Sequence, residues 1–498
     1  MQYARSFLLA TLLVLCSLGV AFAQQADAVQ AAAPDPQQPA VVELVVSPAA
    51  EPRPALKYAL LPMLSERTPG NAAQHYYRAI VLQKQQPKEL WQQYSDKQQV
   101  WLAAALDDPA TKAELGKWLA SQTSALAEIK AGAFREYCDW DFRLQDLRGT
   151  DLLTFLLPEI QECRTLARTL QLQARLELMD GRPDDAFQTL RSGYQLARDT
   201  AQPPYLISSL VGVAITSIMN EELLHLIRHT QANYYWALAA LPEPLVDLRP
   251  AMQFEMNLPL QMFPFLKDAE TAHRSPDEWR RALVECLQGL DDIDGSSSHM
   301  PPWQAELAAA GIVAKLYPLA KEQLIAEGLD RDRVEAMPVG QVVAIQTARS
   351  VKYAFQEVFK LAHLPYHEAT ARMPATLKRL EGEGHLHGHF SGREGLPLTS
   401  LLLPAVGNVM QVEVRTARNL AALQTIEAIR MHAAVGGKLP AALVEVTIVP
   451  VPRNPATGEP FPYSFDAATG AAKLDVPPVG NLTPQHDGKR YVIKLKSK

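Results

Sequence analysis

The sequence predicts a mostly α-helical protein: an irregular array of helical hairpins that ends in a long helix and a small β-hairpin segment. Apolar residues recur at spacings of three and four through most of the chain, and strand signals are scarce before Pro450. The clearest helical pattern lies within residues 401–436, where apolar residues from Leu420 to Ala433 share one face. The charged residues of this helix fall on its other sides: Glu413, Arg415, Arg418, Glu427 and Arg430.

Glycine and proline fix the end of this long helix and the start of the β segment. Gly436 and Gly437 are expected to end the helix, because glycine adopts a left-handed C-cap without strain, and Pro440 prevents a restart. A short hairpin is then predicted from residues 463–465 and 472–474. Residues 401–498 therefore form one predicted region, a long helix plus a small β module.

Length and composition are those of an ordinary globular protein with several domains. The chain has 498 residues, of which 48% are hydrophobic and 20% charged, with a formal net charge of −6. Nucleic-acid binding depends on neutralising phosphates with clustered cations, and this mildly acidic chain has no dense basic run. We therefore expect no nucleic-acid partner.

Residues 1–23 have the pattern of a secretory signal peptide. Arg5 supplies the positive region, residues 7–20 the apolar region, and residues 21–23 an Ala-Phe-Ala cleavage site. The apolar run is short for a membrane span, so no transmembrane segment is expected after cleavage. Retention as an anchor and lipidation at Cys16 remain alternatives. The prediction is an exported protein of the periplasm or cell surface.

Three cysteines remain after cleavage, Cys138, Cys163 and Cys286. An odd number in an exported protein allows at most one internal disulfide together with a free or intermolecular thiol. Three buried, apolar cysteines are the alternative.

The first half of the chain is predicted to pass from a linker into helices. Residues 24–55 are rich in Ala, Pro and Gln and resemble a tether with little to bury. Residues 56–300 form the predicted helical array. Helices are expected after Asn71, after Pro87, and from Asp108, where Asp caps and proline fills the first turn.

One helix pair near residues 162–200 has the pattern of a tetratricopeptide-type unit. A first helix, a tight turn at Gly181 and then Ala and Leu four residues apart give this pattern, but the 34-residue period does not continue. Residues 205–227 add another apolar helix. An irregular array follows, in which each helix pair covers the apolar face of its neighbour.

The middle of the chain is also predicted to be helical. Ser275 and Glu278 form a capping box, and the next helix begins at Pro301. Residues 301–400 are a helical region containing a Gly/His-rich loop at 381–396. A helix is expected over residues 339–363, and Pro365 is expected to stop it.

Several phrases resemble a group of uncharacterised exported proteins of planctomycete-type bacteria. They are spread over residues 70–470: Gly70-Asn-Ala-Ala, Cys138-Asp-Trp, Leu166-Ala-Arg with the 174–197 unit, Tyr235-Trp-Ala-Leu, Glu427-Ala-Ile-Arg and Gly437-Lys-Leu-Pro. The resemblance implies no particular activity. The helix, Leu-Pro turn and small Pro-rich β segment are also similar to the soluble part of pseudopilins, whose methylated N-terminal helix this chain lacks.

The candidate metal site is the run His385, His387 and His389, to which Glu381 and Glu383 add oxygen ligands. In an extended chain alternate residues share one face, so the three imidazoles would suit zinc or copper. The surrounding glycines equally suit a solvated loop without metal. No other cofactor is expected.

Two aromatic groups are the candidate binding residues. Tyr234, Tyr235 and Trp236 are expected to line a ligand groove or to pack in a core. Asp139 and Trp140 could contribute to a site or form a capped, packed corner.

The chain contains no catalytic or nucleotide-binding motif that we recognise, and the GxSxG, GxxxxGK[ST], GxGxxG and CxxC patterns are all missing from it. We therefore predict a protein-interaction or scaffold module of the cell envelope, whose partner is another envelope or exported protein. Two alternatives remain open: an envelope hydrolase with a dispersed polar site, and metal binding through the histidine loop.

Overall fold

The structure is a computed structural model that describes residues 38–143, 157–294, 301–382 and 398–496. The predicted signal peptide (1–23) and the histidines His385, His387 and His389 lie outside these residues. The chain divides into two compact units. Among the described residues, unit 1 comprises residues 143, 252–294, 301–382 and 398–410, and unit 2 comprises residues 38–142, 157–251 and 411–496. The described residues are mostly helical, which confirms the predicted fold class.

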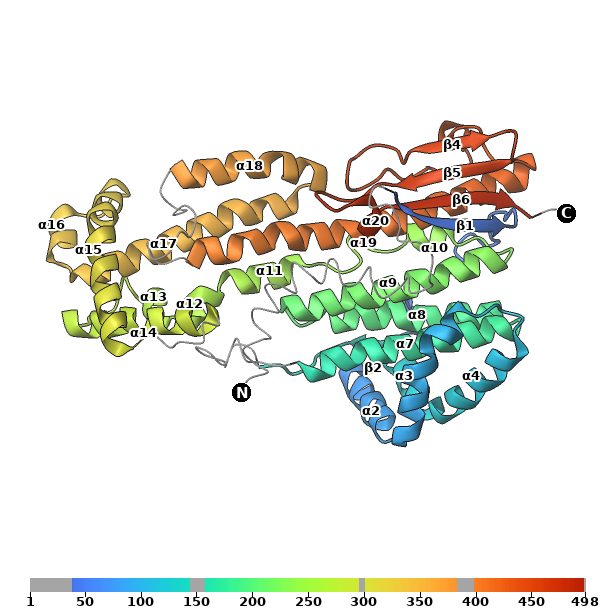
Figure 1. Ribbon diagram of the computed structural model, residues 1–498, viewed down its shortest axis with the longest axis horizontal. Coiled ribbons are helices and arrows are strands. Elements are labelled where there is room, and N and C mark those ends of the chain that lie inside the picture. Colours follow the sequence, from blue (N-terminus) through green and yellow to red (C-terminus); the bar gives the residue numbers. More distant parts are fainter. Residues whose placement is uncertain (1–37, 144–156, 295–300, 383–397, 497–498) are drawn as a thin grey trace. The chain divides into compact units, whose positions relative to one another are not determined.

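Unit 2 consists of packed helices and one four-stranded sheet (Figure 1). Its helices are η1 (Leu64–Glu66), α2 (Ala72–Lys84), α3 (Lys88–Ala103), α4 (Pro109–Ser121), α5 (Thr123–Ala133), α7 (Pro158–Met179), α8 (Pro183–Thr200), α9 (Leu206–His229), α10 (Tyr235–Ala239), the later part of α19 (Leu398–Gly436), η4 (Leu443–Glu445) and α20 (Pro484–Asp487).

The predicted helix starts are confirmed by their caps. The Asn71 side chain accepts from Ala73 N at the start of α2, and the Asp108 side chain accepts from Ala110 N at the start of α4. The helix that begins after Asp108 ends at Ser121 and does not continue toward Tyr137 as its pattern predicts, because the backbone of Gln122 leaves the helical conformation between α4 and α5.

Helices α7, α8 and α9 form the core of unit 2. Gly181, with a φ of +73°, makes the turn between α7 and α8. Helices α8 and α9 approach closely where Gly212 lies against the backbone of Ala197, since a Cβ there would come within 2.6 Å of its carbonyl oxygen. The helix pair predicted near 162–200 is present, while its relation to tetratricopeptide units stays a prediction.

The sheet has the strand order β1-β6-β5-β4. Strands β4 (Tyr463–Asp466), β5 (Ala471–Val476) and β6 (Lys489–Leu495) are antiparallel neighbours, and β1 (Ala40–Val46) adds to β6 in parallel, as Figure 1 shows. The predicted hairpin is thus confirmed as β4–β5. A separate pair, β2 (Thr68–Asn71) and β3 (Arg135–Tyr137), is parallel.

The prediction of a linker over residues 24–55 is wrong for β1 and the residues after it. Leu44 and Val46 are fully buried, and the backbone of Ala49 donates to the carbonyl of Arg430. We call residues 40–67 the N-terminal strap, because they run from the sheet to the start of β2 along unit 2. The Ala/Pro/Gln composition of residues 24–55 did not indicate a strand. The alternating burial of β1 arises because β1 pairs with β6.

Unit 1 is a group of helices around Trp279, which is fully buried and packs against Phe265. The capping box of Ser275 and Glu278 is confirmed, with reciprocal bonds at the start of α14. Its elements are the later part of α11 (Arg249–Met256), α12 (Leu258–Met262), α13 (Pro264–Lys267), α14 (Pro276–Asp294), α15 (Pro302–Ala326), α16 (Arg331–Ala336), α17 (Val339–Phe359), η3 (Lys360–His363), α18 (Tyr366–Gly382) and the first part of α19.

The burial of β1 gives a first testable prediction. Leu44→Ala should lower the free energy of unfolding of unit 2 by about 2–5 kcal/mol, because it removes a fully buried side chain from the sheet. Val41→Ala in the same strand is the matched control, since Val41 is 60% exposed and should change stability by less than about 0.5 kcal/mol. Urea unfolding measures both. Equal, negligible effects would mean that this segment is a tether after all.

Candidate functional site

Of the aromatic residues 234–236, Tyr234 and Tyr235 are buried in unit 2, and Trp236 is partly buried and packs against its core. Tyr234 stacks on Phe187 with ring centroids 5.1 Å apart, and burial raises the pKa of its hydroxyl well above the usual range. The Tyr235 hydroxyl donates to the carbonyl of Pro450 over 2.5 Å, and Trp236 Nε1 donates to Glu51 over 2.7 Å. These contacts support the packing interpretation of the three rings.

Asp139 and Trp140 form a packed corner beside the start of α2. Asn71 holds the backbone of Asp139 from both sides, donating to its carbonyl and accepting from its N–H. Trp140 is buried, stacks on Tyr76, and donates from Nε1 to the carbonyl of Asp199 over 2.8 Å. The corner therefore packs Trp140 beside a carboxylic acid that the sequence analysis did not single out.

Asp199 is the buried carboxylic acid beside this corner. Its carboxylate accepts from the Tyr76 hydroxyl over 2.7 Å and from Gln195 Nε2 over 2.8 Å. Burial raises the pKa of Asp199 to about 6, although both hydrogen bonds and the neighbouring Arg198 act to lower it. Such a buried acid is a candidate for proton transfer, but both its oxygens already have partners within the protein.

The cysteines of the described residues are free and buried, so no internal disulfide forms. Cys138 and Cys163 lie close enough to Asp199 for its charge to act on them. Burial is the larger effect and raises the pKa of Cys163 to about 12 and that of Cys138 further. Both thiols are therefore protonated at neutral pH and are poor nucleophiles.

One carboxylate–histidine pair of the kind that a dispersed hydrolase site needs is present in unit 2. His75 Nδ1 lies 2.7 Å from Glu128 Oε2, and Arg135 Nε donates to His75 Nε2 over 2.9 Å. With Nε2 accepting, Nδ1 carries the proton and donates to Glu128. Neither ring nitrogen is left to accept a proton from a substrate, so this pair supports the local structure.

Charged side chains of α19 are buried at two places along the helix. At the first, Arg430 donates to Glu427 over 2.6 Å and also to the carbonyls of Ser47, Thr230 and Ala232. Both charged side chains are fully buried. This pair connects α19 with the strap and with the loop before α10.

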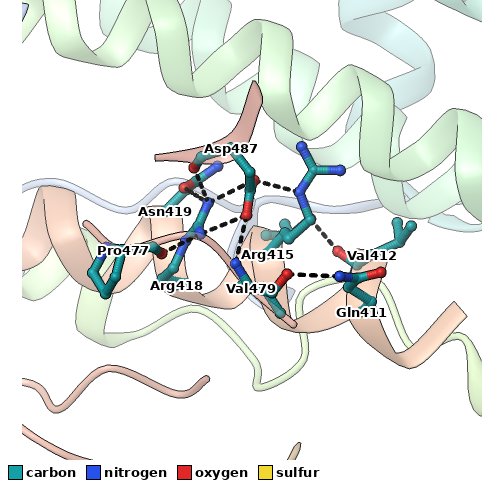
Figure 2. A network of polar contacts seen from close by, with 9 residues as sticks. Gln411, Val412, Arg415, Arg418, Asn419, Pro477, Val479 and Asp487 are labelled. Carbon is teal, nitrogen blue, oxygen red and sulfur yellow. Dashed lines mark hydrogen bonds and ion pairs between the residues drawn. The ribbon is translucent and has the colours of Figure 1, made fainter. Parts of the chain in front are cut away.

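The second place is the network in Figure 2, which holds α20 and the sheet against α19. Asp487 accepts from Arg415 over 2.6 Å and from Arg418 over 2.8 Å, and from the backbone N–H of Val479 over 2.8 Å. Arg418 donates as well to the carbonyl of Pro477. These donors occupy both oxygens of the Asp487 carboxylate, so its hydrogen bonds are made within the protein.

Metal binding finds no support among the described residues, where no group of three or more His, Cys, Asp and Glu side chains is placed to hold an ion. The proposed ligands His385, His387 and His389 lie outside them. Within those residues, one helix, α9, is long and apolar enough to cross a membrane, and 61% of its most apolar stretch is buried inside the protein.

Helix α15 in unit 1 has an exposed apolar face that no contact within the described residues covers. Trp303 is 63% and Leu307 68% exposed. The face continues along the same side of the helix at a spacing of three and four through exposed small or apolar residues: Ala310, Gly311, Ala314 and Pro318. A side chain built at Gly311 would meet no atom within 4 Å. The sequence shows that this helix is rich in apolar residues. The spacing of those residues does not show which side of the helix is covered by the rest of the protein and which side is exposed.

Comparisons with protein-family models, with curated proteins and with solved structures find no match. The resemblance to exported planctomycete-type proteins therefore stays a prediction.

The Asp487 network gives a second prediction. Asp487→Ala should lower the free energy of unfolding by about 3–5 kcal/mol, because it leaves the buried Arg418 without a counter-charge. Asp475→Ala is the control: its ion pair with Arg490 is partly exposed and should be worth about 0–1 kcal/mol. Chemical denaturation compares the two, and similar losses would argue against a structural role for the network.

Asp199 gives a third prediction, on pH. Its folded pKa of about 6 lies above the ordinary value of 3.8 for an aspartic acid, so between these values the folded state keeps a proton that the unfolded chain has lost. The contribution of Asp199 to stability is therefore complete below about pH 4 and is lost as the pH rises through 6. The loss is on the order of 3 kcal/mol.

The measurement is the free energy of unfolding of the natural protein and of Asp199→Asn from pH 4 to 7. The difference between the two proteins should change with pH in the stated direction, since other carboxyl groups contribute equally to both. A difference that is independent of pH would show that Asp199 titrates normally.

Proposed function

We propose that this chain is an exported protein-interaction module, and that the apolar face of α15 is where a partner protein docks. The single observation that carries the proposal is the pair of large side chains, Trp303 and Leu307, which are exposed one turn apart on that helix. Contiguous exposed apolar surface is typical of protein interaction sites. Tryptophan is also among the residues that contribute most to binding energy.

The chemistry of the face fits a partner helix. Small residues at Ala310, Gly311 and Ala314 let a second backbone come close, while Trp303 and Leu307 provide the larger contact area. Two charged residues of α15 are already paired within unit 1: Glu306 with Arg280 over 3.0 Å, and Lys321 with Glu335 over 2.8 Å. A partner with an apolar helical face would therefore bind without leaving these charges unpaired.

The polar interior supports an interaction role over catalysis. The Asp199, His75 and Asp487 groups all have their hydrogen bonds completed within the protein. A catalytic acid, base or nucleophile must instead reach a substrate atom.

The test is a pull-down from the native envelope fraction with residues 24–498, followed by mass spectrometry and a high-salt wash. Leu307→Asp should reduce retention of the specific partner by about tenfold or more, since it removes the burial of a leucine on binding. Val444→Asp is the matched control, because Val444 is 84% exposed in unit 2. Thermal unfolding checks that both variants are folded.

A partner that the natural protein and Val444→Asp retain, and that Leu307→Asp loses, is the expected result. A protein that stays monomeric and retains nothing specific, or a partner retained equally by Leu307→Asp, would overturn the proposal.

A further inference from the structure

Strand β1 forms one edge of the four-stranded sheet in unit 2 (Figure 1). The strand order β1-β6-β5-β4 gives β1 a single neighbour, β6. The backbone of Ala40 donates to the carbonyl of Gly488 over 3.1 Å. The carbonyl of Val46 accepts from the backbone of Lys496 over 2.9 Å. In a parallel pair every second residue makes both of its backbone hydrogen bonds to the neighbouring strand, so the even-numbered residues of β1 face β6.

The odd-numbered residues of β1, Val41, Glu43 and Val45, direct their backbone groups to the free edge. Among the described residues, one hydrogen bond reaches these groups: Arg228 of α9 donates from Nη2 to the carbonyl of Glu43 over 2.8 Å. The three N–H groups and the other two carbonyls have no partner within the described part of the chain. Such a row of unpaired backbone donors and acceptors is the surface to which another strand adds.

The side chains of the same three residues are open to solvent. Val41 is 60% and Val45 is 43% exposed, and Glu43 between them is exposed as well, while Leu44 and Val46 are buried on the other face. Native edge strands are commonly protected from pairing because they are short or carry proline or lysine. Strand β1 has seven residues, of which four are valine and none is proline or lysine. Its sequence therefore favours pairing.

The charge of Glu43 disfavours a second copy of this chain at the edge. Two β1 strands that pair antiparallel through all three outward residues would place the two Glu43 side chains opposite each other. Like charges directly opposite each other destabilise a strand pair. A different chain is therefore the better occupant.

The surroundings of Glu43 indicate which residue of an added strand would lie opposite it. Its partner on β6 is Val492, and the carboxylate of Glu43 has no ion pair within the described residues. Arg490 and Lys494 lie diagonally from it on β6, on the side away from the free edge, and Arg490 already pairs with Asp475. A basic residue on an added strand would face Glu43 directly.

We propose that the free edge of β1 binds an extended segment of another protein, which adds to the sheet as a fifth strand. Backbone hydrogen bonds to Val41, Glu43 and Val45 provide the affinity, and alternate side chains of the segment meet the two exposed valines. The segment is rich in β-branched residues and has a basic residue opposite Glu43. The inference concerns unit 2 and does not depend on the docking face of α15 in unit 1.

The experiment uses residues 24–498 and a synthetic probe. The probe is an acetylated and amidated nonapeptide in which valine and threonine alternate and lysine takes the place of the central valine. Amide hydrogen exchange is followed at single residues. In the free protein the N–H groups of Val41, Glu43 and Val45 should exchange fast, and those of Leu44 and Val46 slowly, because only the latter bond to β6.

Adding about 1 mM probe should slow exchange at the three outward N–H groups and leave the inward ones unchanged. For a dissociation constant of about 100 µM the slowing is roughly tenfold, since exchange then proceeds from the unbound fraction. Leu307→Asp should bind the probe as the natural protein does. The result is thus separate from the test of the α15 face.

Val45→Pro should weaken binding of the probe by about tenfold or more, because it removes one outward N–H and puts the proline ring in the path of the added strand. Proline is tolerated on an edge strand where its missing N–H faces away from the sheet. Val45→Thr is the matched control, since it changes the side chain and keeps the N–H. Slow exchange at Leu44 and Val46 shows that β1 still pairs with β6 in each variant.

A charge exchange tests the contact with Glu43. The natural protein should bind the lysine probe several-fold more tightly than a probe with glutamate at the centre, and Glu43→Lys should reverse this preference.

Protection of the three outward N–H groups that Val45→Pro loses and Val45→Thr keeps supports the proposal. It is overturned if about 1 mM probe gives no protection, or if protection is the same in Val45→Pro. A dimer of the natural protein that Val45→Pro dissociates would also overturn it, because the edge would then belong to a second copy of this chain.

Discussion

The buried ion pair of Glu427 and Arg430 is the interaction on which the arrangement of unit 2 depends. Both side chains are fully buried in α19, where an unpaired charge would cost several kcal/mol. Arg430 donates to three backbone carbonyls besides Glu427, and Glu427 accepts from the N–H of Tyr234. Because the pair is stable only with all these partners present, it ties α19, the strap and the loop before α10 into one structure.

Two other buried ion pairs join separate elements of unit 2. Arg418 and Asp487 join α19 to the sheet, and Arg175 and Glu222 join α7 to α9, each pair nearly or fully removed from water. A buried ion pair adds less stability than apolar packing of the same volume, but it penalises any arrangement that separates its members. We infer that these pairs act mainly to select one arrangement of helices and strands that would otherwise slide on apolar faces.

This use of the polar residues bears on function. Asp199, His75 and Asp487 complete their hydrogen bonds with other groups of the protein, so they are engaged before any ligand arrives. The apolar face of α15 is exposed instead, and the large side chains on it are left to solvent.

The sequence by itself determined most of the helices, the caps of α2 and α4 and the β4–β5 hairpin, because periodicity, Asn71, Asp108 and Gly437 act over a few residues. Only the tertiary structure decided that residues 40–46 form a strand, since its partner β6 is more than 400 residues away in the chain. It also decided the roles of Asp199 and of the charged residues of α19, whose partners come from distant segments. Spacing shows which side of a helix a residue is on, and packing decides whether that side meets water, a counter-charge or a partner.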